Sequence, residues 1–257
     1  MPRPSDSLAP DWPAPPGVRA LFTTRDGGIS APPFDSFNLG NHVRDDPRAV
    51  AGNRARLAAL TAPARPVFLQ QVHGTDVVRL DCSTPDGTEA DACLVQGPGL
   101  AATIMVADCL PVLLAHASGR AVAAAHAGWR GLANGVLEAT VGALREAAGE
   151  GEVIAWLGPC IGPLAFEVGA EVREAFVSAD AEAAAHFRFH GQDGKYWANL
   201  PALARRRLQV SGIAQVHGND GSAAWCTVTQ SSRFFSHRRD AVRLGSTGRM
   251  AACIWID

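Results

Sequence analysis

The sequence lacks three features that would each point to a particular class of protein. It has no basic excess, since 23 lysines and arginines stand against 25 aspartates and glutamates. This balance argues against a dominant surface for nucleic acid or anionic membrane, both of which need positive charge. No apolar run approaches the roughly 20 residues that span a bilayer, and the Pro-rich N-terminus contains no cleavable signal sequence. We therefore expect a cytoplasmic protein with no nucleic-acid or membrane partner.

The sequence also lacks the cysteine spacing of a disulfide-rich or CxxC protein. Its six cysteines form neither a CxxC pair nor a dense framework. Scattered cysteines in a reducing compartment are expected to remain free thiols. Free thiols act as small buried apolar groups or as metal ligands.

Apolar and amphipathic segments follow one another irregularly along the chain. The expected strands are residues 18–24, 67–71, 76–80, 91–96, 101–107, 112–116, 121–125, 153–158 and 250–256. The expected helices are residues 47–60, with Asp46 as the cap and Pro47 at the first position, and residues 133–148, 170–177 and 201–210. Because strands and helices do not alternate strictly, and no repeat or linker is present, the pattern favours an α+β layered fold.

Three motifs place a histidine or a cysteine at the end of an apolar strand, beside a turn. They are QQVHG (70–74), ADCLP (107–111) and HAGWRG (126–131). Ends of neighbouring strands meet in space, so we expect His73, Cys109 and His126 to converge. Two imidazoles and one thiolate suit zinc or copper, and three protein ligands leave the fourth position open, as in catalytic zinc sites. The simpler alternative is that both histidines are structural and the cysteine belongs to the core.

These motifs, together with LGPCIGP (157–163), FEVG (166–169), FFSHRRD (234–240) and TGRMA (247–251), resemble those of the YfiH family over nearly the whole chain. The family is also called laccase-domain or multicopper polyphenol oxidase proteins, or peptidoglycan editing factors. The resemblance implies a single-domain, layered mixed α/β sandwich over residues 1–257, with residues 1–16 as a Pro-rich entry segment. It also implies Zn²⁺ held by His73, Cys109 and His126.

The same resemblance implies an activity. Family members are purine nucleoside phosphorylases that act on adenosine, inosine, guanosine and methylthioadenosine, and they also deaminate adenosine. The expected partners are therefore small molecules, a purine nucleoside and phosphate. The oligomeric state is left open.

Two alternative activities would use the same three residues. A cysteine hydrolase or amidase acting on peptidoglycan precursors would use Cys109 as nucleophile and His126 or His73 as base. A polyphenol oxidase would load copper. A multicopper centre needs many imidazoles, typically in H-x-H pairs, whereas this chain has eight histidines and no such pair. Only a single copper ion, Cu²⁺, in the same site is therefore compatible with the sequence.

The remaining expected site residues lie in or beside the family-like motifs. Cys109, Asp108 and Arg130 are expected to act in catalysis, with Asp108 as a general acid or base. Residues expected to bind substrate are Arg25, Asn38, His42, Gln71, Arg238 and Arg249. The planar guanidinium of arginine can donate two parallel hydrogen bonds to phosphate. The alternative is structural: hydrogen bonds to backbone amides for Asp108, and ion pairs for the arginines.

Overall fold

Two six-stranded β-sheets pack face to face in the computed structural model, which describes residues 7–191 and 194–257. In spatial order, the first sheet contains β1 (Ser7–Leu8), β2 (Val18–Thr23), β15 (Met250–Ile256), β7 (Leu100–Val106), β3 (Arg65–Gln70) and β5 (Thr88–Glu89). The second contains β14 (Gln215–Gly218), β10 (Val153–Leu157), β8 (Leu110–His116), β9 (Ala121–Ala127), β6 (Ala92–Gln96) and β4 (Val77–Arg79).

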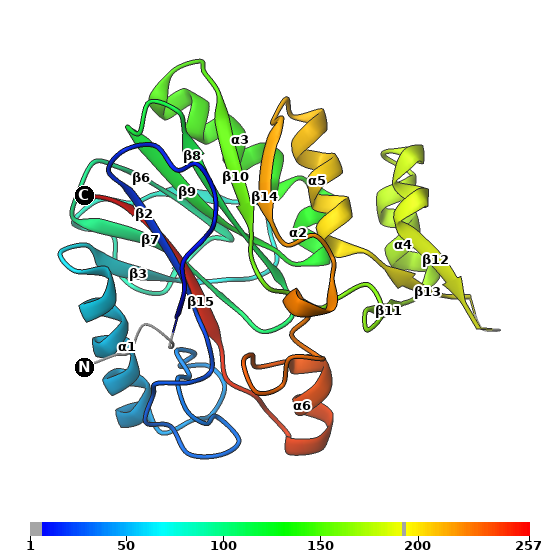
Figure 1. The fold of residues 1–257 in the computed structure, drawn as a ribbon, viewed down its shortest axis with the longest axis horizontal. Helices are drawn as coiled ribbons and strands as arrows, with labels where there is room; N and C mark the ends of the chain where they lie inside the picture. The colour runs from blue at the N-terminus through cyan, green and yellow to red at the C-terminus, as the bar shows by residue number, and fades with distance from the viewer. Residues whose placement is uncertain (1–6, 192–193) are drawn as a thin grey trace.

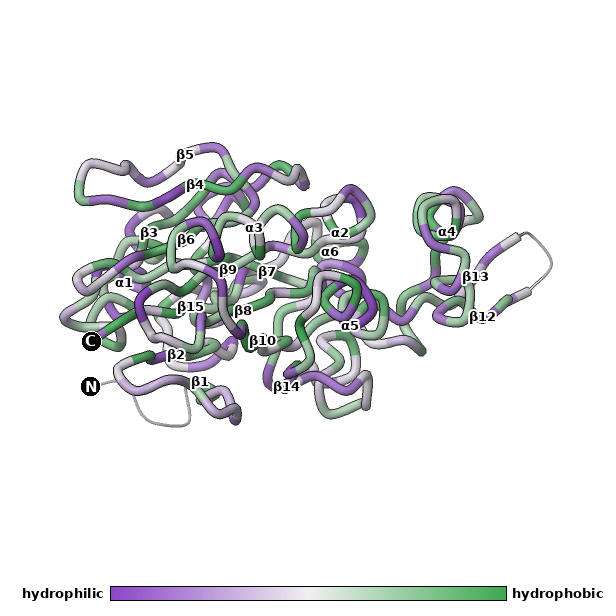
Figure 2. Tube along the Cα trace, turned by 90° about the horizontal axis from the view of Figure 1, so that it is seen from above, coloured by the Kyte–Doolittle hydropathy of each residue, from purple (hydrophilic) through white to green (hydrophobic). Residues whose placement is uncertain are grey.

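The core between the sheets is formed by side chains from both of them. Phe22 and Ile104 of the first sheet pack with Leu113, Ala124 and Trp156 of the second. Strands β8 and β9 are buried at every position, because the other sheet covers one face and helices cover the opposite face. Continuous apolar sequence, rather than alternation, is the expected pattern for such strands, and Figure 2 shows these central strands as mostly hydrophobic.

Helices cover the outer faces of the sandwich (Figure 1). The α-helices are α1 (Pro47–Thr61), α2 (Trp129–Asn134), α3 (Val136–Ala148), α4 (Ala170–Val177), α5 (Leu200–Val210) and α6 (His237–Leu244), and short 3₁₀ turns lie at Ala181–His186 and Ala223–Trp225. Helix α1 packs on the first sheet through Leu57, and α3 packs on the second sheet through Leu137, Val141 and Leu144. Asp46 caps α1 by accepting a hydrogen bond from the backbone N–H of Arg48.

A small lobe projects from the side of the molecule opposite α1 (Figure 1). It contains α4 and a third sheet in the order β11 (Glu167–Val168), β13 (Lys195–Ala198) and β12 (Phe187–His190). Among the described residues, no helix is both long enough and apolar enough to cross a membrane.

The layered α+β fold predicted from the sequence is confirmed, and the expected helix 170–177 and final strand 250–256 have the observed bounds. One prediction is wrong: residues 133–148 are not one helix. Gly135 adopts a left-handed conformation (φ 100°) that separates α2 from α3, and glycine does so without the steric cost of a Cβ. The two-residue edge strands β1 and β5, the lobe sheet and β14 were not predicted, because strands of two to four residues carry too little periodicity. Helix α6 was also not predicted. The expected Pro-rich entry segment lies partly outside the described residues, at 1–6.

The chain passes from the first sheet to the second at three places that matter for function. These are the segments between β3 and β4, between β5 and β6, and between β7 and β8. They contain His73, Asp91 and Cys109, respectively. The crossings gather residues distant in sequence at one edge of the sandwich.

Candidate metal centre and its pocket

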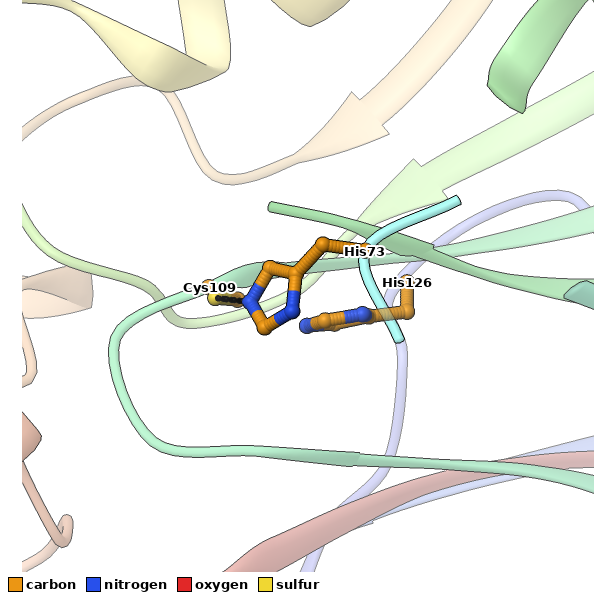
Figure 3. Close-up of side chains that lie close together, drawn as sticks. All are labelled: His73, Cys109 and His126. Atoms are coloured by element: carbon orange, nitrogen blue, oxygen red, sulfur yellow. Dashed lines mark hydrogen bonds between the residues drawn. The ribbon is translucent and has the colours of Figure 1, made fainter. Parts of the chain in front are cut away.

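Three side chains able to bind a metal ion converge at this edge. The ligand atoms of His73, Cys109 and His126 all lie within 4.8 Å of one another. Cys109 Sγ is 3.8 Å from His73 Nε2, and the two imidazole centroids are 4.7 Å apart at 70° (Figure 3). The expected convergence is therefore observed. One detail differs, since His126 lies within β9 rather than beyond its end. His126 is buried, Cys109 half-buried and His73 exposed, so the group can be reached from one side.

Asp91 holds two of the three residues in place. One of its carboxylate oxygens accepts hydrogen bonds from the backbone N–H groups of Val72 (3.1 Å) and Gly74 (2.6 Å). The other accepts from the backbone N–H of His73 (2.9 Å) and lies 2.7 Å from His126 Nδ1. Because Nδ1 is occupied by the carboxylate, His126 is left with Nε2 to offer to a metal. Carboxylates commonly orient zinc-ligating histidines in this way.

The backbone adopts a left-handed conformation at two residues of the site, His73 (φ 63°) and Asp108 (φ 85°). This conformation costs a non-glycine residue roughly 1–2 kcal/mol. The hydrogen bond from the His73 N–H to Asp91 offsets the cost at the first position. At the second, the Asp108 carboxylate is itself fixed by hydrogen bonds. Strained backbone held by its surroundings is typical of functional sites.

The Asp108 carboxylate accepts hydrogen bonds from three donors. They are the hydroxyls of Thr227 (2.5 Å) and Ser236 (3.1 Å) and the backbone N–H of Arg238 at the start of α6 (2.6 Å). These contacts fasten the Cys109 turn to a segment more than 100 residues away in sequence. They support a positioning role for Asp108, whereas general acid or base chemistry would require one of these bonds to be given up.

Gly128 makes room for the ligands. A Cβ atom at this position would lie 2.8 Å from His73 Cδ2 and 3.2 Å from Cys109 Sγ. Real Cβ atoms do not approach other heavy atoms as closely as the first distance. The glycine after His126 therefore allows the backbone to pass directly against the imidazole and the thiol.

The electrostatics of the cluster favour an ionised thiol. Burial disfavours the Cys109 thiolate, but the charge of His126 and hydrogen bonds from both histidines outweigh it and lower the pKa of Cys109 to about 6. Burial likewise disfavours a charge on His126, yet Cys109 and Asp91 raise the pKa of His126 to about 9. Burial acts to raise the pKa of Asp91, and hydrogen bonds from His126 and Gly74 more than compensate, so this pKa is lowered.

This donor set fits a zinc or copper ion. A thiolate available at neutral pH, a histidine whose free nitrogen is Nε2 and a second, exposed histidine are the ligand types that both metals prefer. With three protein ligands, one coordination position remains for substrate or water. The same set fits magnesium and calcium poorly, because these ions prefer oxygen ligands.

The cluster lies in a pocket of about 880 Å³. Its apolar wall contains Phe68, Leu69, Val72, Met105, Val106, Trp129, Ile161, Phe166 and Leu200. Its polar wall contains Asn41, His42, Arg54, Gln70, Gln71, Asp86, Asp108, His237, Arg238 and Arg249. A mainly apolar cavity with a few convergent polar groups is the usual form of a small-molecule site.

Four of the six expected substrate-binding residues line this pocket: His42, Gln71, Arg238 and Arg249. Gln71 is engaged by the backbone of Met105, to which its amide both donates and accepts at 2.8 Å. Arg238 donates to the carbonyls of Ala165 and Glu167.

The other expected residues do not line the pocket. Arg25 pairs with Asp35 and donates to the Asp35 and Ser231 carbonyls. Asn38 is buried, and its side-chain oxygen accepts a hydrogen bond from the backbone N–H of Arg249 (2.8 Å). Arg130, expected in catalysis, is exposed and lies over the Trp129 ring. The ion pair between Arg25 and Asp35 is the structural alternative that the sequence left open for the arginines.

Two residues of the site were missed from the sequence: Asp91, which positions the cluster, and Arg54, which lines the pocket. Asp91 opens a buried apolar strand, and a carboxylate at such a position is rarely found without partners, which could have drawn attention to it. Arg54 is on α1, where it resembles any other charged residue on a helix, and no sequence signal distinguishes it.

Known proteins resemble this chain over almost its full length. Residues 19–257 match the family described as multi-copper polyphenol oxidoreductase laccase. A Pseudomonas aeruginosa protein named purine nucleoside phosphorylase is 52% identical over 249 residues, which cover 97% of this chain and 98% of that protein. The Escherichia coli protein named purine nucleoside phosphorylase YfiH is 50% identical over 253 residues, with coverage of 98% and 99%.

Solved structures agree with these sequence matches. The crystal structure of a Neisseria meningitidis protein from the family DUF152 has a TM-score of 0.90 and 45% identity, covering 98% of this chain and 99% of that one. YlmD from Geobacillus stearothermophilus has a TM-score of 0.88 and 29% identity, with coverage of 100% and 98%. Sequence, fold and the three-residue cluster lead to the same assignment: the chain belongs to the YfiH, or laccase-domain, family.

Proposed function

We propose that the protein is a zinc-dependent purine nucleoside phosphorylase for adenosine, inosine, guanosine and methylthioadenosine, and that it also deaminates adenosine. Relatives that are 52% and 50% identical are named purine nucleoside phosphorylase, which supports the phosphorylase activity. The observation that carries the proposal is the position of His73, Cys109 and His126 in a pocket that combines an apolar wall with arginine side chains. A purine nucleoside and phosphate need these two kinds of surface.

The three-residue cluster would hold the zinc ion, which supplies Lewis acidity in the pocket. The chain's own residues do the binding and positioning. The apolar wall, including Trp129, Ile161 and Phe166, takes the purine and excludes water. Arginine donors hold phosphate against the anomeric carbon, and holding two reactants together removes much of the entropic barrier.

The atoms balance without an oxidant or reductant. The bond between the anomeric carbon and the purine nitrogen breaks, and its electron pair stays with the purine. A phosphate oxygen forms the new bond to the anomeric carbon, and the proton of hydrogen phosphate ends on the purine. The products are the free base and ribose 1-phosphate, or the 5-methylthio derivative of ribose 1-phosphate when the substrate is methylthioadenosine. Deamination of adenosine consumes water instead of phosphate: the water oxygen bonds to the purine carbon that bears the amine, the carbon–nitrogen bond breaks, and inosine and ammonia are released.

The test is the product made from inosine with and without inorganic phosphate. The proposal requires ribose 1-phosphate, formed only when phosphate is present, while adenosine deamination continues in phosphate-free buffer. Free ribose released at the same rate in both buffers would show a hydrolase and refute the phosphorylase assignment.

A second candidate is a cysteine hydrolase or amidase acting on peptidoglycan precursors. The lowered pKa of Cys109 and the 3.8 Å approach of His73 Nε2 to its Sγ favour it, since a thiolate beside an imidazole is a nucleophile. Metal content separates the candidates, because a zinc-bound thiolate is a poor nucleophile. If Cys109→Ala retains zinc but loses turnover, the hydrolase replaces the phosphorylase. A single-copper polyphenol oxidase would instead show one copper per chain and phenol turnover that depends on it.

A further inference from the structure

The pocket wall beside the metal cluster contains basic side chains that are brought together by one turn. Arg54 Nε donates to the carbonyl of Leu39 (3.0 Å). The backbone N–H of Leu39 in turn donates to the carbonyl of Arg249 (3.1 Å). A Cβ on Gly40 would lie 2.7 Å from Arg249 Cγ, so the turn packs directly on that side chain. His42 follows two residues later and lines the same wall.

Arg54 is held rigidly and has donor groups to spare. Its guanidinium lies over the Phe68 ring at 3.9 Å, which fixes the plane. Its Nη1 is 3.8 Å from the Asp86 carboxylate, and its Nη2 is 4.0 Å from Met105 Sδ. Both distances exceed that of a strong hydrogen bond. The edge of the guanidinium is therefore weakly satisfied by the protein.

Arg249 also has donor groups that the described residues do not satisfy. Its Nη1 donates to the carbonyls of Thr247 (3.0 Å) and Gly248 (3.2 Å). In the described part of the chain, no carboxylate lies within salt-bridge distance of this guanidinium, and its Nε and Nη2 have no hydrogen-bond acceptor. Arg249 is half-buried, and a cation drawn out of water is normally paired, so an anion is the missing partner.

The pKa values of Arg249 and His42 show that burial disfavours positive charge on this wall. Burial lowers the pKa of Arg249, although the charges of Cys109 and Asp108 oppose the effect. Burial, followed by the charges of Arg249 and Arg54, lowers the pKa of His42. Among the described residues, two acidic side chains line this pocket. Asp86 is exposed and also shared with Arg65. Asp108 accepts hydrogen bonds from Thr227, Ser236 and the Arg238 N–H.

We infer that Arg54 and Arg249, with His42 at their side, form an oxyanion subsite for a phosphate group next to the metal cluster. Two guanidinium edges with free donors match the geometry of a tetrahedral oxyanion. The inference rests on the proposed function in that a phosphorylase must bind phosphate there. It assigns this role to Arg54 and Arg249 rather than to the other arginines considered. Phosphate could arrive as the free inorganic ion or as part of a nucleotide.

The experiment measures equilibrium binding, so that it does not depend on turnover. Inorganic phosphate is titrated into the zinc-containing full-length protein, without nucleoside, by calorimetry or ³¹P NMR. A hydrogen bond from a charged donor contributes enough that Arg249→Gln or Arg54→Gln should raise the dissociation constant about 10- to 100-fold. The matched control is Arg48→Gln, an exposed arginine on the same helix α1 that does not line the pocket, and it should leave phosphate binding unchanged.

Lysine variants distinguish the loss of phosphate contacts from a general loss of structure. Arg54→Lys and Arg249→Lys keep the charge but lose the planar fork, so phosphate binding should weaken in both while zinc content and melting temperature stay near those of the wild type. A second titration uses adenosine 5′-monophosphate. If the phosphate arrives attached to a nucleoside, the nucleotide rather than inorganic phosphate will show the dependence on Arg54 and Arg249. Either dependence supports the subsite.

Two results separate this inference from the proposed function. Arginine-dependent phosphate binding without ribose 1-phosphate formation would support the subsite and remove the phosphorylase assignment. Ribose 1-phosphate formation in Arg54→Gln and Arg249→Gln, with an unchanged phosphate KM and unchanged nucleotide binding, would keep the phosphorylase and overturn the subsite. Unchanged binding of both phosphate and nucleotide in these variants would also overturn it.

Discussion

Replacing Asp91 by asparagine tests how the cluster is positioned, because the change removes a charge but almost no volume. One carboxylate oxygen accepts from the N–H groups of Val72 and Gly74, and the other accepts from the N–H of His73 and contacts His126 Nδ1. An amide has only one acceptor oxygen. Whichever way it is oriented, its NH₂ group faces two donors.

The expected magnitude follows from this count. Two hydrogen bonds to a charged acceptor are lost, each contributing about 1.5–3 kcal/mol. The bonds share one acceptor group and are not additive, so we expect the free energy of unfolding to fall by about 3 kcal/mol. The His126 ring also loses its orienting partner. Removing such a partner typically weakens metal binding about 10- to 100-fold.

The assay has two readouts and one control. Urea denaturation gives the free energy of unfolding, and competition with a chromophoric chelator gives the zinc affinity. The control is Asp76→Asn, an exposed aspartate in the crossing between β3 and β4, which should leave both quantities unchanged. Wild-type zinc affinity in a correctly folded Asp91→Asn protein would refute the positioning argument. Loss of stability alone, with zinc affinity retained, would limit Asp91 to holding the His73 turn.

Three further predictions concern the cluster. His73→Ala, Cys109→Ala and His126→Ala should each remove most bound metal and activity together, and elemental analysis of the wild type should find about one zinc per chain. Iodoacetamide should alkylate Cys109 in metal-stripped protein with a rate that rises through about pH 6, well below the value of about 8.5 for a free thiol. Gly128→Ala should lower zinc affinity because its Cβ would lie 2.8 Å from a His73 ring carbon, whereas Gly142→Ala, with nothing within 4 Å, should retain zinc.

The contrary outcomes are equally specific. Three or more coppers per chain would contradict the single-site assignment. For alkylation, Cys109→Ser identifies the signal of the site, because the thiol must be ionised to react and the rate therefore rises with pH through its pKa. A midpoint near pH 8.5 would show that the histidines do not stabilise the thiolate. Unchanged zinc affinity in Gly128→Ala would mean that the backbone can move away from the imidazole.

Much of the sandwich and the three residues of the candidate metal site could be predicted from the sequence by itself. Strands such as β8 and β9 are continuous apolar runs, and α1 carries its own start signal at Asp46 and Pro47, so both are encoded locally. His73, Cys109 and His126 stood out because each adjoins a turn or an apolar strand. Short segments, including α6, gave no comparable signal.

Only the tertiary structure decided what surrounds those ligands. Asp91 reaches His73 and His126 because three crossings between the sheets meet at one edge. Arg54 joins Arg249 because both bind one turn, although they lie almost 200 positions apart. Arg25 and Arg130 do not line the pocket: Arg25 pairs with Asp35, and Arg130 lies over the Trp129 ring. Local sequence patterns set the conformation of each segment, whereas the meeting of distant side chains depends on packing of the whole sandwich.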